Sequence, residues 1–328
     1  ITWGLISALN PYVNEISELN MISEFNRFFK SKTLASTYKP TLAKCLLDLG
    51  DFVEDEGGNW VKIEDDTYTV DLHFVAARFL RFYHPLRFTF KLRQQATPNR
   101  IAIYEILEKY SDQLGTKSTP SKKQMCKEQF SQMREEAINN DALKRQVLPK
   151  LLNDCNIYEY TIGSKFIKIK KDVVEYMRDN KKILESALNH MIASYLEKCN
   201  SSPNISTKLE EKISRTKLTS KNLQEIIDLQ DSCCFYCGEK GDSFAQDHFL
   251  PWNYLFQTEQ YNMVPACQRC NSSKNDKLTV QKYLEKAIDR NKKLHDVPMG
   301  YSAEFMKNMY ENCRLEYHGR DKTLWQNV

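Results

Sequence analysis

The sequence predicts an α+β fold, in which a mostly helical N-terminal region with β-hairpins precedes a small C-terminal zinc finger. Two observations lead to this prediction. Apolar residues recur at helical spacing along most of the chain, and the period changes to two in a few short stretches. Near the C-terminus, four cysteines stand in two Cys-x2-Cys pairs, a spacing typical of structural zinc sites.

Residues 1–112 predict a helical domain with one β-hairpin. The stretches "NEISELNMISEFNRFF" and "KPTLAKCLLDLG" have helical periodicity, and Pro40 and Gly50 mark the start and the end of the second helix. The stretches "WVKI" and "YTVDL", separated by "EDDT", predict a hairpin, and "HFVAARFLRFY" returns to helix.

A polar segment at 113–125 is the predicted linker to a second region at 126–207. This region repeats the order of the first, with a helix in "DALKRQVLPKLLND", two strands in "IYEYTIGSKFIKIK", and a long helix after them. Helix, hairpin and helix make up a winged-helix unit, so two winged-helix-like units are one interpretation of the N-terminal region. Residues 208–328 form the last predicted domain, with its core at about 220–285 and a helical tail.

The composition restricts the class of protein. The net charge of +4, from 47 basic and 43 acidic residues, is too small to indicate a polyanionic partner by itself. No run of about 18 apolar residues predicts a membrane span, and the first residues lack the basic flank of a signal peptide. Six of the ten cysteines stand singly, without the spacing of a disulfide framework. We therefore expect a cytoplasmic protein that is not attached to a membrane.

The four paired cysteines predict one structural zinc ion. Cys234 and Cys237 form the first pair, and Cys267 and Cys270 form the second after a gap of 29 residues. Four thiolates in two such pairs close a tetrahedral zinc site. Coincidence in a cysteine-rich chain and a redox role are the alternatives, and two matched pairs outside a thioredoxin-like context disfavour both.

Two short strands and a helix are predicted between and after the cysteine pairs. The stretch "SFAQDHFLPW" contains Asp247 and His248, whose side chains point to opposite sides if the segment is a strand. The stretch "YNMVPACQRCN" forms a second strand, and a helix begins at Asn271. An Asp-His step alone is more often a surface pair than a functional site, so its meaning depends on the residues around it.

This arrangement resembles the HNH family of the His-Me finger, or ββα-metal, nucleases. The family pattern has an acidic residue before a histidine, an asparagine 14 residues after the histidine, and a histidine or asparagine nine residues further on. His248, Asn262 and Asn271 have these spacings, and a zinc ribbon frames the pattern in many members. The resemblance covers residues from about 220 to 285, about a fifth of the chain.

The resemblance implies metal-dependent hydrolysis of phosphodiester bonds. His248 would take a proton from the attacking water, and its ordinary pKa near 6.5 predicts that activity falls as the pH drops through about 6 to 7. Asp247 and Asn271 would supply oxygen ligands to Mg²⁺, with Mn²⁺ as an alternative. Asn262 would brace the loop between the strands, and Lys274 would contact a phosphate.

A second candidate for nucleic-acid binding is the stretch "RFTFKLR", residues 87–93. Its strict alternation predicts a strand with Arg87, Lys91 and Arg93 on one face and apolar residues on the other. The cations would then either follow the phosphates of a nucleic acid or form an ordinary solvated face, and the sequence leaves both interpretations open.

The resulting hypothesis is an HNH endonuclease, with DNA as the expected substrate and RNA as the alternative. The stretch from Asp247 to Lys274 also resembles those of bacterial restriction and phage-defence nucleases, which implies a role in antiviral defence. Two other functions stay open: an effector subunit held inactive by an ATPase or sensor partner, and a non-catalytic zinc module that binds nucleic acid. The presence of His248 argues against the second. A homodimeric state also stays open.

Overall fold

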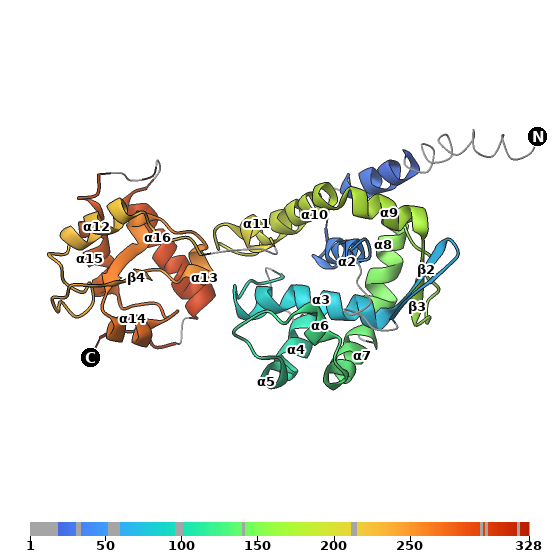
Figure 1. Cartoon of the computed structure of the whole chain (residues 1–328), viewed down its shortest axis with the longest axis horizontal. Coiled ribbons are helices and arrows are strands. Elements are labelled where there is room, and N and C mark those ends of the chain that lie inside the picture. Colours follow the sequence, from blue (N-terminus) through green and yellow to red (C-terminus); the bar gives the residue numbers. More distant parts are fainter. Residues whose placement is uncertain are drawn as a thin grey trace, which may run out of the picture. The chain divides into compact units, whose positions relative to one another are not determined.

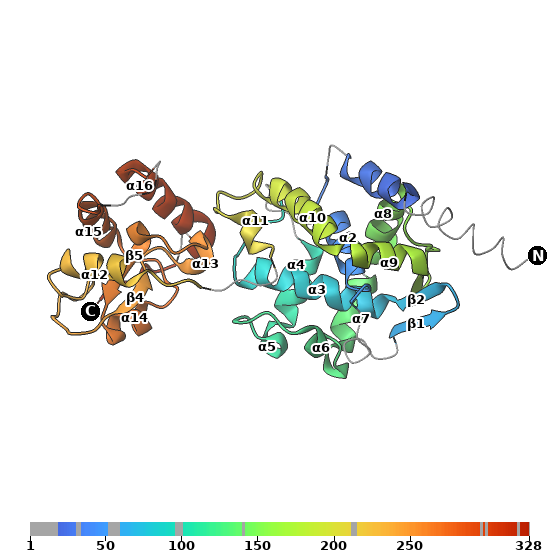
Figure 2. The same ribbon diagram turned by 45° about the horizontal axis from the view of Figure 1, so that its top comes forward.

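The structure, a computed structural model, describes residues 19–30, 34–51, 60–95, 101–139, 142–210, 215–295, 298, 301–319 and 322–327. Its internal contacts divide the chain into two compact units (Figures 1 and 2). The first unit is drawn from the residues up to Thr89 and from Arg93–Cys199, and the second from Phe90–Leu92 and from Asn200 onward. Among the described residues, no helix is both long and apolar enough to span a membrane.

The first unit is a helical body with a small antiparallel sheet. Its helical segments are residues 19–29, α2 (Tyr38–Leu47), α3 (Leu72–Phe88), α4 (Ala102–Lys109), α5 (Ser111–Leu114), α6 (Lys122–Met125), η3 (Glu128–Phe130), α7 (Ser131–Asn139), η4 (Ala142–Val147), α8 (Leu148–Asp154), α9 (Lys171–Asp179) and α10 (Lys181–Leu196). Its strands are β1 (Val61–Glu64), β2 (Thr67–Asp71) and β3 (Phe166–Lys170), in the order β1-β2-β3. These elements, with those of the second unit below, confirm the predicted α+β class.

The β1–β2 hairpin confirms the first predicted hairpin. Val61 lies opposite Val70 and Glu64 lies opposite Thr67, and the turn between the strands contains Asp65 with a left-handed backbone (φ 49°). An aspartate tolerates this conformation better than most residues that carry a side chain.

The second predicted hairpin forms only in part. Of the two strands predicted at 157–170 only β3 forms, and it pairs with β2, while the residues before it contribute a single bridge from Glu159 to Lys168. The physical reason lies in the alternation of β3, because Ile167 and Ile169 are buried whereas the residues between them are exposed. Pairing with β2 places the buried Ile167 opposite the buried Val70. Both predicted winged-helix-like units therefore contribute strands to one sheet.

The strand predicted at 87–93 is wrong. Arg87 and Phe88 form the last turn of α3, which continues through Pro85, and Lys91 has a left-handed backbone (φ 53°) that interrupts an extended conformation. Of the predicted apolar face, Phe90 and Leu92 are buried, although they do not belong to a strand. A proline usually ends a helix because it lacks an N–H, and the sequence does not reveal that α3 continues beyond it.

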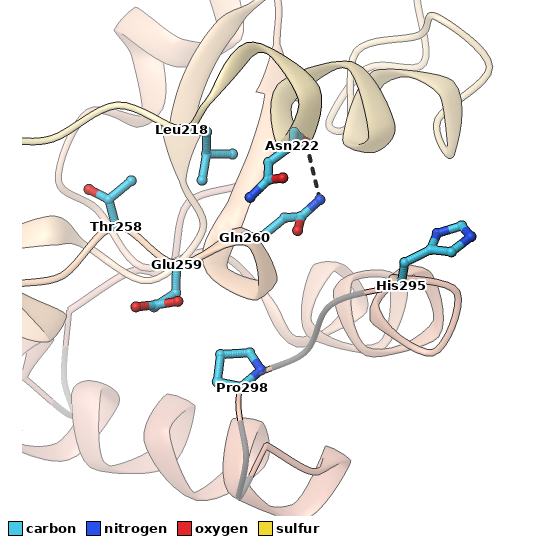
Figure 3. A pocket seen from close by; sticks show the side chains of 7 residues that line it. All are labelled: Leu218, Asn222, Thr258, Glu259, Gln260, His295 and Pro298. Carbon is cyan, nitrogen blue, oxygen red and sulfur yellow. Dashed lines mark hydrogen bonds between the residues drawn. The ribbon is translucent and has the colours of Figure 1, made fainter.

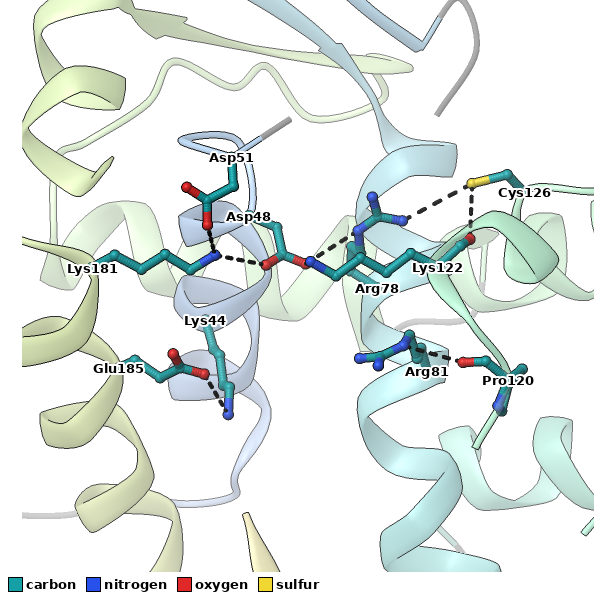
Figure 4. A network of polar contacts seen from close by, with 10 residues as sticks. All are labelled: Lys44, Asp48, Asp51, Arg78, Arg81, Pro120, Lys122, Cys126, Lys181 and Glu185. Carbon is teal, nitrogen blue, oxygen red and sulfur yellow. Dashed lines mark hydrogen bonds and ion pairs between the residues drawn. The ribbon is translucent and has the colours of Figure 1, made fainter. Parts of the chain in front are cut away.

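Asp48 is the centre of a polar network that joins four helices of the first unit (Figure 4). Its carboxylate follows the end of α2 and meets Arg78 of α3 at 3.2 Å, Lys122 of α6 at 3.0 Å and Lys181 of α10 at 3.4 Å. Burial raises the pKa of the Asp48 carboxyl, but the three cations outweigh burial and hold this pKa below its usual value. The network therefore fixes the helices through one ionised carboxylate.

We expect Asp48→Asn to lower the free energy of unfolding of the first unit by about 3 kcal/mol. The side chain of Arg78 is only 3% exposed, so it would lose a carboxylate that compensates its charge away from water. Denaturant unfolding followed by circular dichroism measures the change. Asp179→Asn is the matched control, because Asp179 is 68% exposed, pairs with Arg178 beside it and should have little effect. Equal stability of the two variants would contradict the prediction.

The second unit contains both cysteine pairs. Its helical segments are α11 (Ile205–Lys208), α12 (Ser220–Asp228), α13 (Trp252–Leu255), η5 (Gln260–Asn262), α14 (Gln268–Lys274), α15 (Gln281–Asn291), α16 (Ala303–Asn312) and η6 (Cys313–His318). The strands β4 (Ala245–His248) and β5 (Met263–Ala266) form a two-stranded antiparallel sheet (Figure 2). The helices α15, α16 and η6 follow the sheet toward the C-terminus.

The small sheet and the helix after it have a ββα order. Asp247 lies opposite Val264 and His248 lies opposite Met263, and α14 follows β5 and packs against β4. Two strands of four residues cannot bury a core by themselves. Buried side chains from the surrounding helices and loops complete the core; among them are Phe235, Phe249, Leu284, Met306 and Tyr310.

Candidate functional site

Cys234, Cys237, Cys267 and Cys270 converge into one cluster. Their sulfur atoms all lie within 4.8 Å of one another, and the Sγ atoms of Cys237 and Cys267 are 3.8 Å apart. A tetrahedral zinc site with Zn–S bonds of about 2.3 Å separates its sulfurs by about 3.8 Å. The cluster could therefore bind one zinc ion.

Tight turns orient the thiols of this cluster. The amide of Gly238 donates to the carbonyl oxygen of Cys234, and Gly238 has a φ of 77°, where a side chain would be strained. Burial raises the pKa of the Cys234 thiol, but hydrogen bonds from three backbone amides outweigh burial and lower this pKa to about 7. One of these donors is the amide of Cys267, at 3.3 Å from Sγ. A thiol that loses its proton near neutral pH suits a metal ligand.

The strand β4 presents Asp247 and His248 on opposite sides. Asp247 is buried, and its Oδ2 accepts a hydrogen bond from the Tyr236 hydroxyl at 2.5 Å and pairs with the Lys274 ammonium at 3.0 Å. The Lys274 side chain is fully buried and also donates to the carbonyl oxygen of His248 at 2.7 Å. Lys274 thus holds the strand from α14 and does not project into solvent, which corrects the predicted phosphate contact.

Asn271 lies on α14 one turn before Lys274 and is half-buried. Residues three apart share a face of a helix, so the Asn271 amide lies on the face that brings Lys274 to Asp247. Oδ1 of Asp247 is 3.4 Å from the Lys274 ammonium and is less engaged than Oδ2. A carboxylate oxygen and an amide oxygen are ligands that a hard cation such as Mg²⁺ prefers, so these two residues could hold one.

Asn262 braces the turn that follows His248. It is fully buried, and its side chain makes two hydrogen bonds with the backbone of Leu250: Oδ1 accepts from the amide at 2.8 Å and Nδ2 donates to the carbonyl oxygen at 3.1 Å. Its own carbonyl oxygen accepts from the amide of Phe249 at 2.7 Å. These bonds fix the end of β4 against the start of β5 and so determine where His248 stands.

His248 is half-buried and is held through one ring nitrogen. Its Nε2 is 3.3 Å from Oγ1 of Thr258, and that hydroxyl donates to the carbonyl oxygen of Thr216 at 3.1 Å. A carbonyl oxygen only accepts, so the hydroxyl proton points to Thr216 and Oγ1 accepts the proton of Nε2. We infer that Nδ1 is the basic nitrogen of the ring.

The surroundings of His248 keep its ring neutral. Burial, followed by the positive charges of Arg215 and Lys274, lowers the pKa of His248 to about 4. The ring can therefore accept a proton at neutral pH.

A pocket of about 410 Å³ adjoins Thr258 (Figure 3). The other residues that line it are Leu218, Asn222, Glu259, Gln260, His295 and Pro298. The amide nitrogen of Gln260 donates to the carbonyl oxygen of Asn222 at 3.1 Å and to Glu225 at 2.8 Å, whereas its Oε1 is buried without a hydrogen bond among the described residues. Thr258 also contacts His248, so the pocket lies beside the histidine.

The segment that contains this geometry matches a known family. Residues 234–277 match the family model described as HNH endonuclease, and they include the four cysteines, both strands and α14. The chain contains an HNH endonuclease domain. No curated protein and no solved structure matches the chain. The class of the domain implies that it binds nucleic acid.

Three residues hold parts of the HNH domain in place, and no motif spacing in the sequence predicted them. Tyr236, inside the first cysteine pair, bonds Asp247, and Thr258 holds His248. Arg290 of α15 is buried and donates to the carbonyl oxygens of Met263 at 2.7 Å and Tyr261 at 3.2 Å. Of the three, only Tyr236 has a telling position in the sequence, because it lies between Cys234 and Cys237 of the first cysteine pair.

The other predicted nucleic-acid contacts lie outside the matched HNH segment. Arg87 forms an ion pair with Glu108, and the ammonium of Lys91 lies 3.9 Å from the ring centroid of Tyr317. Arg93 is exposed. These cations do not share one face of a strand, and they therefore do not form the row of charges predicted to follow phosphates.

Proposed function

We propose that this protein is a metal-dependent endonuclease that hydrolyses phosphodiester bonds in nucleic acid, with DNA as its substrate. The observation that supports the proposal most is the neutral, half-buried His248 on β4, with Asp247 beside it and Asn271 on the helix that packs against the strand. This combination lies within the HNH domain. In this proposal, His248 is the base, and Asp247 on β4 and Asn271 on α14 are the two oxygen ligands.

In the proposed reaction, His248 accepts a proton from the attacking water at Nδ1 while Thr258 holds Nε2. Asp247 and Asn271 would hold Mg²⁺, or alternatively Mn²⁺. When bound, the metal ion supplies positive charge for the phosphate and the leaving oxygen. Lys274 balances the charge of Asp247 and holds the backbone of His248, and so keeps both residues in place.

The first test is a cleavage assay of the full chain. Supercoiled plasmid, linear duplex, single-stranded DNA and RNA are incubated with the protein in Mg²⁺ or in EDTA. The proposal predicts that DNA is cut in Mg²⁺ and stays intact in EDTA. Cleavage that persists in EDTA, or no cleavage of any substrate in Mg²⁺ or Mn²⁺, would contradict it.

The pH dependence of cleavage differs from the expectation for an ordinary histidine. A base with a depressed pKa is neutral above that value, so the activity is present above pH about 4 and is lost only as the pH falls through it. We expect no decline between pH about 7 and 6, and circular dichroism at each pH checks that the fold persists. A half-maximal rate near pH 6.5 would show that the surroundings do not lower the pKa of His248.

The proposal includes a structural zinc ion and a reducing compartment. The cysteine cluster would hold the zinc that fixes β5 and α14. All ten cysteines are free, which suits the cytoplasm better than an oxidising compartment.

We also propose a recognition role for the N-terminal part of the chain. The first unit contributes none of the HNH residues, yet it has its own polar network and buried core. It would bind nucleic acid or a protein partner such as an ATPase or sensor subunit, in the predicted domains 1–112 and 126–207. The resemblance of the stretch from Asp247 to Lys274 to restriction and phage-defence nucleases supports a role in bacterial defence.

A further inference from the structure

The segment 215–219, here called the basic strap, lies against the candidate site. The carbonyl oxygen of Thr216 accepts from Thr258, the residue that holds His248. Two residues later, the amide of Leu218 donates to Oε1 of Gln246 on β4 at 3.0 Å. The backbone of the strap is thus attached to the site at two points.

The side chains of the strap divide between the core and the solvent. Leu218 packs against the hydrophobic core of the second unit, whereas Arg215 and Lys217 are exposed. Arg215 and Lys217 are separated by one residue, the likewise exposed Thr216. The two cations therefore flank the point at which the strap is bonded to Thr258, the residue that contacts His248.

The guanidinium of Arg215 is held over an aromatic ring. Its central carbon lies 4.7 Å from the ring centroid of Trp252, which starts α13 four residues after His248. Stacking on a ring leaves the N–H groups at the edge of the guanidinium available to phosphate oxygens. Among the described residues, neither Arg215 nor Lys217 forms an ion pair with a carboxylate. Arg215 also lies close enough to His248 for its charge to affect the ring.

We propose that Arg215 and Lys217 form a phosphate-binding site that holds the backbone of the substrate next to the bond to be cut. The ligand class is the phosphodiester backbone of nucleic acid, and Trp252 positions Arg215 for it. This inference rests on the proposed function and goes beyond it, because neither cation belongs to the family pattern. It also replaces the face predicted at residues 87–93.

The test measures binding separately from cleavage. The full chain with His248→Ala binds a fluorescent DNA duplex, a single strand and an RNA hairpin at several salt concentrations. Adding Arg215→Ala and Lys217→Ala should weaken binding and reduce the slope of log affinity against log salt by about 2 on the duplex. Arg215→Lys keeps the charge and should retain the slope. Lys307→Ala, on the exposed face of α16, is the charge-matched control and should leave both quantities unchanged.

The outcomes separate this inference from the proposed function. If the wild type cleaves DNA but the double alanine variant keeps the full salt slope, the phosphate site is wrong and the nuclease proposal stands. If the protein binds DNA through the strap but cuts nothing, the phosphate site stands and the nuclease proposal is wrong. No binding to any of the three probes overturns the phosphate site. Zinc content and circular dichroism of each variant check that the fold is unchanged.

Discussion

His248→Ala is expected to reduce Mg²⁺-dependent cleavage by about 10² or more. The variant removes the nitrogen that accepts the proton of the attacking water, and it leaves Asp247 and Asn271 in place. The protein should stay folded, keep its zinc and still bind nucleic acid. The measurement is the initial rate of plasmid cleavage at saturating protein, together with the affinity for a DNA duplex.

The control for this variant is His190→Ala, which removes an exposed histidine of α10 in the first unit. It should cleave at the wild-type rate. If His248→Ala cut as fast as His190→Ala, His248 would not be the base. Unchanged binding with lost cleavage would in turn separate an enzyme from a module that only binds nucleic acid.

Asp247→Ala is a less specific test than the sequence implies. Besides removing a proposed metal ligand, it would leave the buried ammonium of Lys274 without its carboxylate and the Tyr236 hydroxyl without its acceptor. Loss of activity could then come from unfolding. Asn271→Ala avoids this problem, because Asn271 is half-buried on the surface of α14, and its defect should diminish at high Mg²⁺ concentration.

Cys267→Ser is expected to abolish tight zinc binding and to unfold the second unit. The purified wild type should contain about one zinc ion per chain, because the four sulfur atoms lie close enough to share one. The β4–β5 sheet has eight residues in its strands, so the metal supplies much of the stability of this region. The first unit has its own core and should remain folded.

Metal analysis and unfolding of the wild type and the variant measure this effect. Cys233→Ser is the matched control, because Cys233 is adjacent to the cluster but its thiol donates to the carbonyl oxygen of Asp231 and takes no part in it. This control should retain zinc and a folded second unit. A zinc-free wild-type protein with a folded second unit would contradict the structural role of the metal.

The sequence by itself determined the parts of the site that depend on local spacing. Two Cys-x2-Cys pairs predicted one cluster, because two residues between cysteines let a tight turn bring both thiols to one metal ion. The Asp-His step and the spacings to Asn262 and Asn271 predicted the HNH resemblance, and the family match covers the same segment. The first hairpin was predictable for the same reason, since its strands are neighbours in the chain.

Only the tertiary structure decided which residues meet across long separations. Alternation around residue 167 predicted a hairpin with the preceding residues, but those contribute a single bridge, and β3 pairs along its length with β2, about a hundred residues away. Lys274 looked like a phosphate contact until its burial against Asp247 was known. Arg215 comes near His248 through the strap, whose position depends on hydrogen bonds to Thr258 and Gln246. Such contacts depend on which surfaces exclude water together, and a local pattern does not contain this information.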